Sequence, residues 1–160
     1  MNPGQILVAN RQGVYVIKLV GDVRLTFCIS FDQFIDAMLA DTELTSVLFD
    51  LSDAEAVDST TLGLMAKISL LSQDQRNITP VILATNSSIK RILNSMGFAD
   101  IFSIVDKLDS SLIPSKSLCC DDQNAPMIKE RVIEAHKILM SLNEQNADTF
   151  KNLVKMLEEG

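Results

Sequence analysis

Short apolar runs alternate with segments of helical periodicity up to residue 105, and this alternation restricts the fold more than any other feature of the sequence. The runs typical of β-strands are residues 5–9, 14–20, 46–51, 81–85 and 101–105. The segments whose apolar residues recur at helical spacing are residues 31–39, 60–75 and 89–96. The order ββαβαβαβ predicts an α/β fold with a mixed sheet, because strands joined through helices pair in parallel and the helices pack against the sheet.

Small polar residues and glycines mark the expected ends of these elements. Gly21 interrupts the second apolar run, so we expect the second strand to end there. Ser30, and either Ser87 or Ser88, precede helical segments and are expected N-caps, since a hydroxyl can accept a hydrogen bond from the first turn. Gly97 follows the third helical segment and is the expected residue just beyond its C-terminus.

The composition changes near residue 112, where the alternation ends. Residues 113–126 contain two prolines and no periodicity, which indicates a linker. Two amphipathic helical stretches follow, separated by the sequence NEQN at 143–146. Their apolar positions are Ile128, Val132, Ala135, Leu139 and Leu142, then Phe150, Leu153, Val154 and Leu157. We therefore expect a domain at residues 1–112, a linker at 113–126 and a helical hairpin at 127–160 that packs back on the same chain.

The charge and hydropathy of the chain argue against two kinds of partner. The 14 lysines and arginines are scattered and the formal net charge is −7, so no nucleic-acid partner is expected. No apolar run approaches the roughly 20 residues that span a bilayer. The N-terminus also lacks a basic segment followed by a long apolar stretch. We therefore expect a cytoplasmic protein with no membrane partner.

The residues that most often bind metals or carry catalysis do not form a pattern in this sequence. Cys28, Cys119 and Cys120 lack the spacing of zinc ligands and are interpreted as reduced thiols. His136, the single histidine, lies near the apolar seam of the hairpin, and the sequence pairs it with no carboxylate or serine. Three carboxylates bracket an expected turn and are typical of solvated loop residues: Asp50, Asp53 and Glu55. We predict no catalytic residue, no metal and no cofactor, which disfavours a small α/β enzyme.

Four small polar residues lie between two buried elements, in the sequence AVDSTTLGLMAKI at 56–68. They are Asp58, Ser59, Thr60 and Thr61. In one interpretation Asp58 or Ser59 is simply the N-cap of the following helix. In the other, the turn is a site for an anion, because the free N–H groups and the helix dipole attract negative charge. A phosphate on Ser59 would lie in that field but beside Asp58, so it would change the surface there.

This stretch resembles the STAS domain of bacterial anti-sigma factor antagonists, whose motif is D-S-[ST]-G-L-G between a strand and a helix. Residues 48–51 match the strand, and the motif is matched at Val57, Asp58, Ser59, Thr60, Leu62 and Gly63. The later stretch TPVILATNSSIKRILNSMGFADIFSIVD is also similar to the family, and the resemblance covers residues 5 to 110. Thr61 stands where the family has its first glycine. The tail is similar to that of a gammaproteobacterial subgroup with a C-terminal helical extension.

The resemblance implies a switch rather than an enzyme. The unphosphorylated form would bind an anti-sigma factor that is also a serine kinase, phosphorylation would end the binding, and a PP2C-type phosphatase would restore it. Ser59 would be the phosphoacceptor, with Thr60 as the second candidate, and Asp58 would orient the hydroxyl or the kinase. The implied partner surface is Asp58, Ser59, Thr60, Thr61, Leu62 and Gly63.

Two alternatives stay open for this role. The chain could be a constitutive STAS scaffold, such as the small subunit of a lipid-transport ATPase, which would use the same surface without phosphorylation. The partner of a switch could also be another signalling enzyme.

Overall fold

The computed structural model of the chain describes residues 3–108, 116–118 and 124–160. A seven-stranded mixed sheet carries the fold, in the order β6-β5-β3-β2-β1-β7, with β4 paired to the end of β2. The strands are β1 (Gln5–Arg11), β2 (Val14–Val23), β3 (Ser46–Asp50), β4 (Ala54–Val57), β5 (Val81–Leu83), β6 (Ser103–Val105) and β7 (Lys116–Ser117). The helices are α1 (Cys28–Ala40), α2 (Ser59–Arg76), α3 (Ser87–Ser95), α4 (Ala125–Leu142) and α5 (Glu144–Glu159), with 3₁₀ turns at Leu25–Phe27 and Phe98–Asp100.

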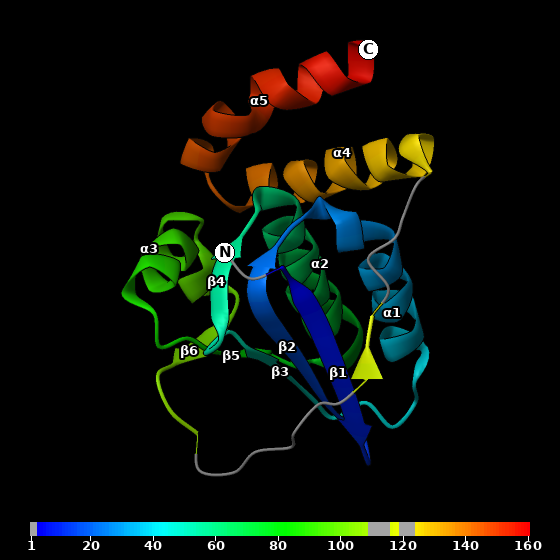
Figure 1. Cartoon of the computed structure of the whole chain (residues 1–160), viewed down its shortest axis with the longest axis vertical. Helices are drawn as coiled ribbons and strands as arrows, with labels where there is room; N and C mark the ends of the chain where they lie inside the picture. The colour runs from blue at the N-terminus through cyan, green and yellow to red at the C-terminus, as the bar shows by residue number, and fades with distance from the viewer. Residues whose placement is uncertain (1–2, 109–115, 119–123) are drawn as a thin grey trace.

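The predicted α/β architecture is confirmed. Strands β1 and β2 form an antiparallel hairpin, and β2, β3, β5 and β6 pair in parallel, each joined to the next through a helix. Alternate residues of β1 and β3 are buried, namely Ile6 and Val8 in β1 and Val47 and Phe49 in β3. These side chains face α1 and α2, which lie behind the sheet in Figure 1. The core therefore lies between the sheet and these helices.

The start of the chain departs from the prediction at two places. Strand β2 continues through Gly21 to Val23, because residues 21–23 pair with β4, a strand that lies where the sequence predicted a turn. The Gly21 N–H also donates to the carbonyl of Asp53. Ser30 is not an N-cap but lies inside α1, whose N-cap is Phe27 at the end of a 3₁₀ turn.

At helix α3 the predicted N-cap is wrong, whereas the predicted glycine after its C-terminus is confirmed. Its N-cap is Asn86, whose side chain accepts hydrogen bonds from the N–H groups of Ser88 and Ile89, so neither predicted serine caps it. Gly97 follows the helix in the left-handed conformation at φ 86°, as expected. A Cβ atom there would lie 2.8 Å from the side-chain nitrogen of Asn143, so glycine also allows the start of α5 to approach α3.

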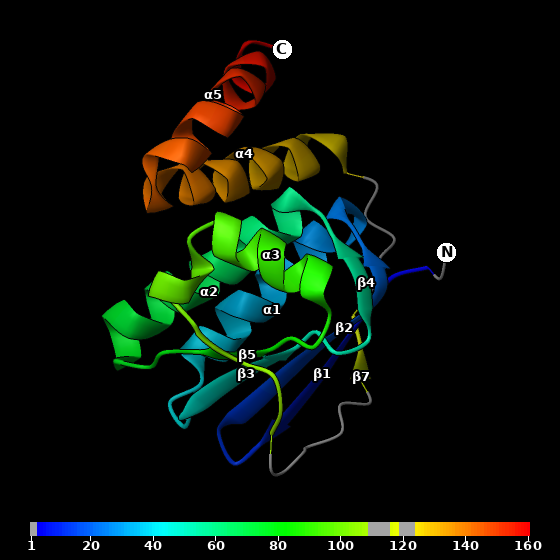
Figure 2. The same ribbon diagram turned by 90° about the vertical axis from the view of Figure 1, so that its left-hand side faces the viewer.

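The C-terminal hairpin is present and packs on the same chain. Helix α4 lies across α2, with further contacts to α1, and α5 packs mainly on α4. Figures 1 and 2 both show α4 lying across the domain and α5 on its outer side. Only Asn143 interrupts the two helices, so residues 144–146 belong to α5 rather than to the predicted break.

The predicted linker at 113–126 is only partly described. Within it, β7 adds an antiparallel edge strand to β1, and α4 already begins at Ala125. Cys119 and Cys120 lie outside the described residues, whereas Cys28 is buried in α1. Among the helices of the described ranges, none has both the length and the hydropathy that crossing a membrane requires.

Candidate functional site: the start of α2 beneath α4

Asp58 caps helix α2 and leaves the hydroxyl of Ser59 available for other contacts. Its carboxylate accepts a hydrogen bond from the N–H of Thr61 at 2.9 Å, which is the N-cap bond expected at a helix start. The second carboxylate oxygen accepts a hydrogen bond from the N–H of Leu25 at 2.7 Å and so ties the helix start to the 3₁₀ turn that follows β2. Ser59 is the first residue of α2, and it is half-buried.

The Ser59 hydroxyl contacts a residue that is 77 positions away in the sequence. Its Oγ lies 2.7 Å from Nε2 of His136 on α4. The other ring nitrogen, Nδ1, lies 2.7 Å from the carbonyl oxygen of Val132, one helical turn earlier. Because a carbonyl can only accept, Nδ1 carries the hydrogen, and in the neutral ring Nε2 is then an acceptor. The Ser59 hydroxyl therefore donates to His136.

His136 is a buried residue of α4 that contacts both α2 and α5. Its side chain is 2% exposed, and its ring contacts Phe150 of α5 edge-on at a centroid distance of 5.0 Å. From the sequence we expected no serine partner for this histidine, and that expectation is wrong, because its Nε2 contacts Ser59. The only sequence signal was a polar residue beside Ala135 in an otherwise apolar seam, and it did not identify the partner.

The rest of the motif is buried, and α4 covers its end. Thr60, Thr61 and Leu62 are all 2–3% exposed. Gly63 faces α4 so closely that a Cβ atom would lie 2.3 Å from the carbonyl oxygen of Ala135. Such a distance is too short for any side chain, so glycine at 63 permits the two helix backbones to meet.

A cluster of charged side chains joins α4 to α1 and α2. Lys67 of α2 lies 2.7 Å from Asp32 of α1 and 3.0 Å from Glu134 of α4, and Arg131 lies 2.7 Å from Asp32. Asp32 is almost fully buried, so these cations compensate its charge. Burial alone would lower the pKa of Lys67, but its hydrogen bonds and charge pairing with Asp32 and Glu134 outweigh that and raise it.

The comparison with known proteins identifies the family. The model of the STAS domain matches residues 5–111. The chain belongs to the STAS domain family. Its structure is similar to the crystal structure of an anti-sigma factor antagonist from Mycobacterium paratuberculosis, with a TM-score of 0.54 and 22% identity over 67% of this chain and 89% of that one. The sequence matches none of the curated proteins with which it was compared.

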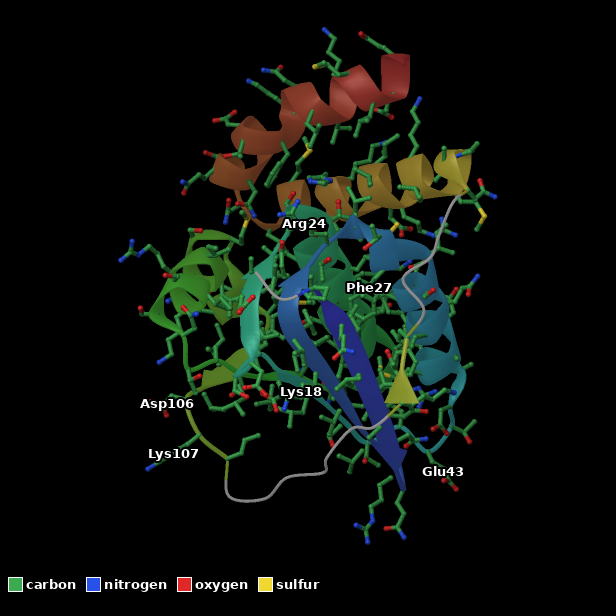
Figure 3. The ribbon with its side chains drawn as sticks, in the orientation of Figure 1. Lys18, Arg24, Phe27, Glu43, Asp106 and Lys107 are labelled. Atoms are coloured by element: carbon green, nitrogen blue, oxygen red, sulfur yellow. The ribbon has the colours of Figure 1, made fainter. Side chains whose placement is uncertain are left out.

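The covering hairpin lies outside the matched STAS domain, because α4 begins only at Ala125. Figure 3 shows Arg24 and Phe27 where β2 leads into α1, at the end of the STAS domain that α4 covers. The STAS motif and the added helix thus meet at Ser59 and Gly63.

A cavity of about 560 Å³ lies next to Ser59, between the STAS domain and the hairpin. Its walls are mainly apolar, from Leu25 of the STAS domain and from Ile128, Val132, Leu153 and Leu157 of the hairpin, with Lys129 among them. In the residues that the structure describes, no group of histidine, cysteine and acidic side chains is arranged to hold a metal ion.

The Ser59–His136 pair is better suited to hold a hydroxyl than to activate a nucleophile. In serine hydrolases a buried carboxylate on Nδ1 stabilises the imidazolium that forms during catalysis. Here the group on Nδ1 is the neutral carbonyl of Val132. The carboxylate of Asp58 is adjacent in sequence and would oppose negative charge developing near Ser59. The geometry therefore favours a serine whose hydroxyl is held in place by His136.

Proposed function

We propose that this chain is a phosphorylation-controlled switch of the anti-sigma factor antagonist type, without catalytic activity of its own. The unphosphorylated form binds an anti-sigma factor or serine kinase, phosphorylation of Ser59 ends the binding, and a PP2C-type phosphatase restores it. The observation that carries the proposal is the division of roles at the helix start. Asp58 makes the cap, so the hydroxyl of Ser59 is not required by α2 and can be modified.

Exposure favours Ser59 over the neighbouring hydroxyls as the phosphoacceptor. Thr60 and Thr61 are each 3% exposed, whereas Ser59 is half-buried. A phosphate adds about −1.5 to −2 charge. On Ser59 it would gain from the N-terminus of α2 but would stand beside the Asp58 carboxylate, so the partner would meet a strongly acidic surface.

The site is tested by tandem mass spectrometry of the protein purified from its native host, and after incubation with a candidate serine kinase. We expect one phosphate, on Ser59. Phosphate found only on Thr60, Thr61 or Ser87 would refute the assignment.

The consequence for binding is tested by pull-down of a candidate anti-sigma factor with Ser59→Ala and Ser59→Asp. We expect Ser59→Ala to keep binding and Ser59→Asp to lose most of it, because the second change adds charge at the interface. Ser87→Asp is a matched control, since Ser87 is the first residue of α3 and follows the capping Asn86. Equal binding by both Ser59 variants would instead support the constitutive scaffold, including a subunit of a lipid-transport ATPase.

A further inference from the structure

We propose that the hairpin of α4 and α5 is an intramolecular cover, which must move away from α2 before a kinase or a protein partner can reach Ser59. This inference rests on the proposed function. It adds a regulatory element from outside the STAS domain, because the matched domain ends at residue 111 and the hairpin begins at residue 125.

The cover acts directly on the modifiable hydroxyl. A kinase must bring a phosphate in line with the Ser59 oxygen. In the closed chain this oxygen donates its hydrogen to His136, which is 2% exposed and is backed by Phe150 of α5. A protein partner meets the same obstacle at Gly63, where the backbone of α4 already occupies the surface at Ala135.

The cover is built so that it can move as a unit. Helices α4 and α5 make extensive contacts with each other, including that between His136 and Phe150, and these contacts persist if the hairpin leaves α2. Several contacts that hold it to the domain are polar and can be replaced by water. They are the Ser59–His136 and Asn146–Met96 hydrogen bonds and the Glu134–Lys67 and Arg131–Asp32 pairs.

Phosphorylation and closure oppose each other in this geometry. A phosphate on Ser59 has no room between Oγ and Nε2, which are 2.7 Å apart. Turned the other way, it would enter a cavity that already holds the Asp58 carboxylate and whose walls are mainly apolar, with Lys129 as the one cation among the residues that line it. A phosphorylated chain therefore favours the open hairpin, and by linkage an open hairpin favours phosphorylation.

Gly63→Ala opens the cover without weakening α2. Alanine is a better helix former than glycine in a helix interior, but the new methyl group would lie 2.3 Å from the Ala135 carbonyl oxygen, so α4 must shift. Gln75→Ala is the matched control, because residue 75 is exposed near the other end of the same helix.

The readouts are hydrogen exchange of α4 and labelling of a thiol at position 59 in the full chain. The background for labelling is Ser59→Cys with Cys119→Ser and Cys120→Ser, and Cys28 is retained because it is 2% exposed. With a maleimide as the probe, we expect Gly63→Ala to speed labelling of position 59 roughly tenfold, within the range usual for coupled sites. Amides of residues 127–142 should exchange faster, whereas those of β3 should not change.

A second pair of variants tests the proposal independently, in case Gly63→Ala does not fold. Glu134→Lys places a cation beside Lys67 and should also open the hairpin, whereas Glu130→Lys makes the same charge change on a side chain that is 73% exposed. Unchanged labelling of position 59 in both Gly63→Ala and Glu134→Lys would overturn the proposal, whether or not α4 exchanges faster. These readouts need no kinase, so they test the cover separately from the proposed function. If Ser59 is covered but is never phosphorylated, the proposed function is refuted and the cover is not.

Discussion

Neighbouring residues at the start of α2 have separate roles that the sequence motif alone does not distinguish. Asp58 binds two backbone N–H groups, Ser59 binds His136, and Thr60 and Thr61 are buried. The sequence could place Ser59 at a helix start, because the apolar pattern resumes directly after it. The sequence could not show that the Asp58 carboxylate also accepts a hydrogen bond from the N–H of Leu25, because that contact joins residues 33 positions apart.

A prediction at the residue scale concerns Tyr15, the single tyrosine in a chain without tryptophan. Burial, and then the hydrogen bond and charge of Asp41, raise the pKa of Tyr15 to about 12. The folded state therefore holds this proton more tightly than the unfolded state, whose tyrosine has a pKa of about 10. The stabilisation is complete below pH 10 and is lost as the pH rises towards 12.

The tyrosinate absorbance of the native protein measures this directly. We expect a midpoint near 12 in the folded protein and near 10 in denaturant. Asp41→Asn should bring the folded midpoint closer to 10, because it removes the negative charge next to the phenol. A folded midpoint near 10 would contradict the partly buried Tyr15–Asp41 hydrogen bond.

At the scale of elements, helix α4 is held to the STAS domain by charge and by close backbone contact, not by its apolar seam alone. The seam was visible in the sequence, and Ala135 and Leu139 of it are indeed fully buried. The sequence did not show the charged cluster of Asp32, Lys67, Glu134 and Arg131, because its members come from three helices and follow no regular spacing. Strand β4 was also missed, since four residues with an exposed Glu55 carry too weak a pattern.

Asp32→Asn is predicted to destabilise the chain by about 2 kcal/mol, because it leaves Lys67 and Arg131 without the buried carboxylate between them. The figure is below the 3–5 kcal/mol typical of a fully buried pair, since Arg131 is 26% exposed. Urea unfolding followed by circular dichroism measures the change.

Glu158→Gln is the control for this prediction, because it breaks the exposed pair with Lys137. It should cost less than about 0.5 kcal/mol. If Asp32→Asn lowered the free energy of unfolding by as little as Glu158→Gln does, the cluster would contribute little to stability.

At the scale of the whole molecule, the chain is a STAS domain with an additional helical layer over its motif (Figure 2). The layer buries side chains that would otherwise face water, among them Leu139 and Phe150. The hairpin also reaches α3, because Asn146 donates hydrogen bonds to the carbonyls of Met96 and Leu139 at 2.9 Å. The hairpin therefore contributes to stability as well as covering Ser59.

A chain that ends at Leu118 tests this contribution, because it keeps β7 and removes the hairpin. We expect it to melt several degrees lower or to aggregate, since each 1 kcal/mol corresponds to roughly 4–8 °C in a domain of about this size. Thermal denaturation followed by circular dichroism gives the answer. An unchanged melting temperature would show that the hairpin rests on the domain without stabilising it.

The sequence by itself determined the order of most strands and helices, the helical hairpin and the position of Ser59 at a helix start. These are local properties, because the period of apolar residues and the residues at helix ends are set within a few positions. Only the tertiary structure decided which faces meet. The contact between Ser59 and His136 depends on how α4 crosses α2, and that crossing depends on Gly63 and on charges from three helices. No local pattern encodes such a crossing, because it follows from the simultaneous packing of segments far apart in the chain.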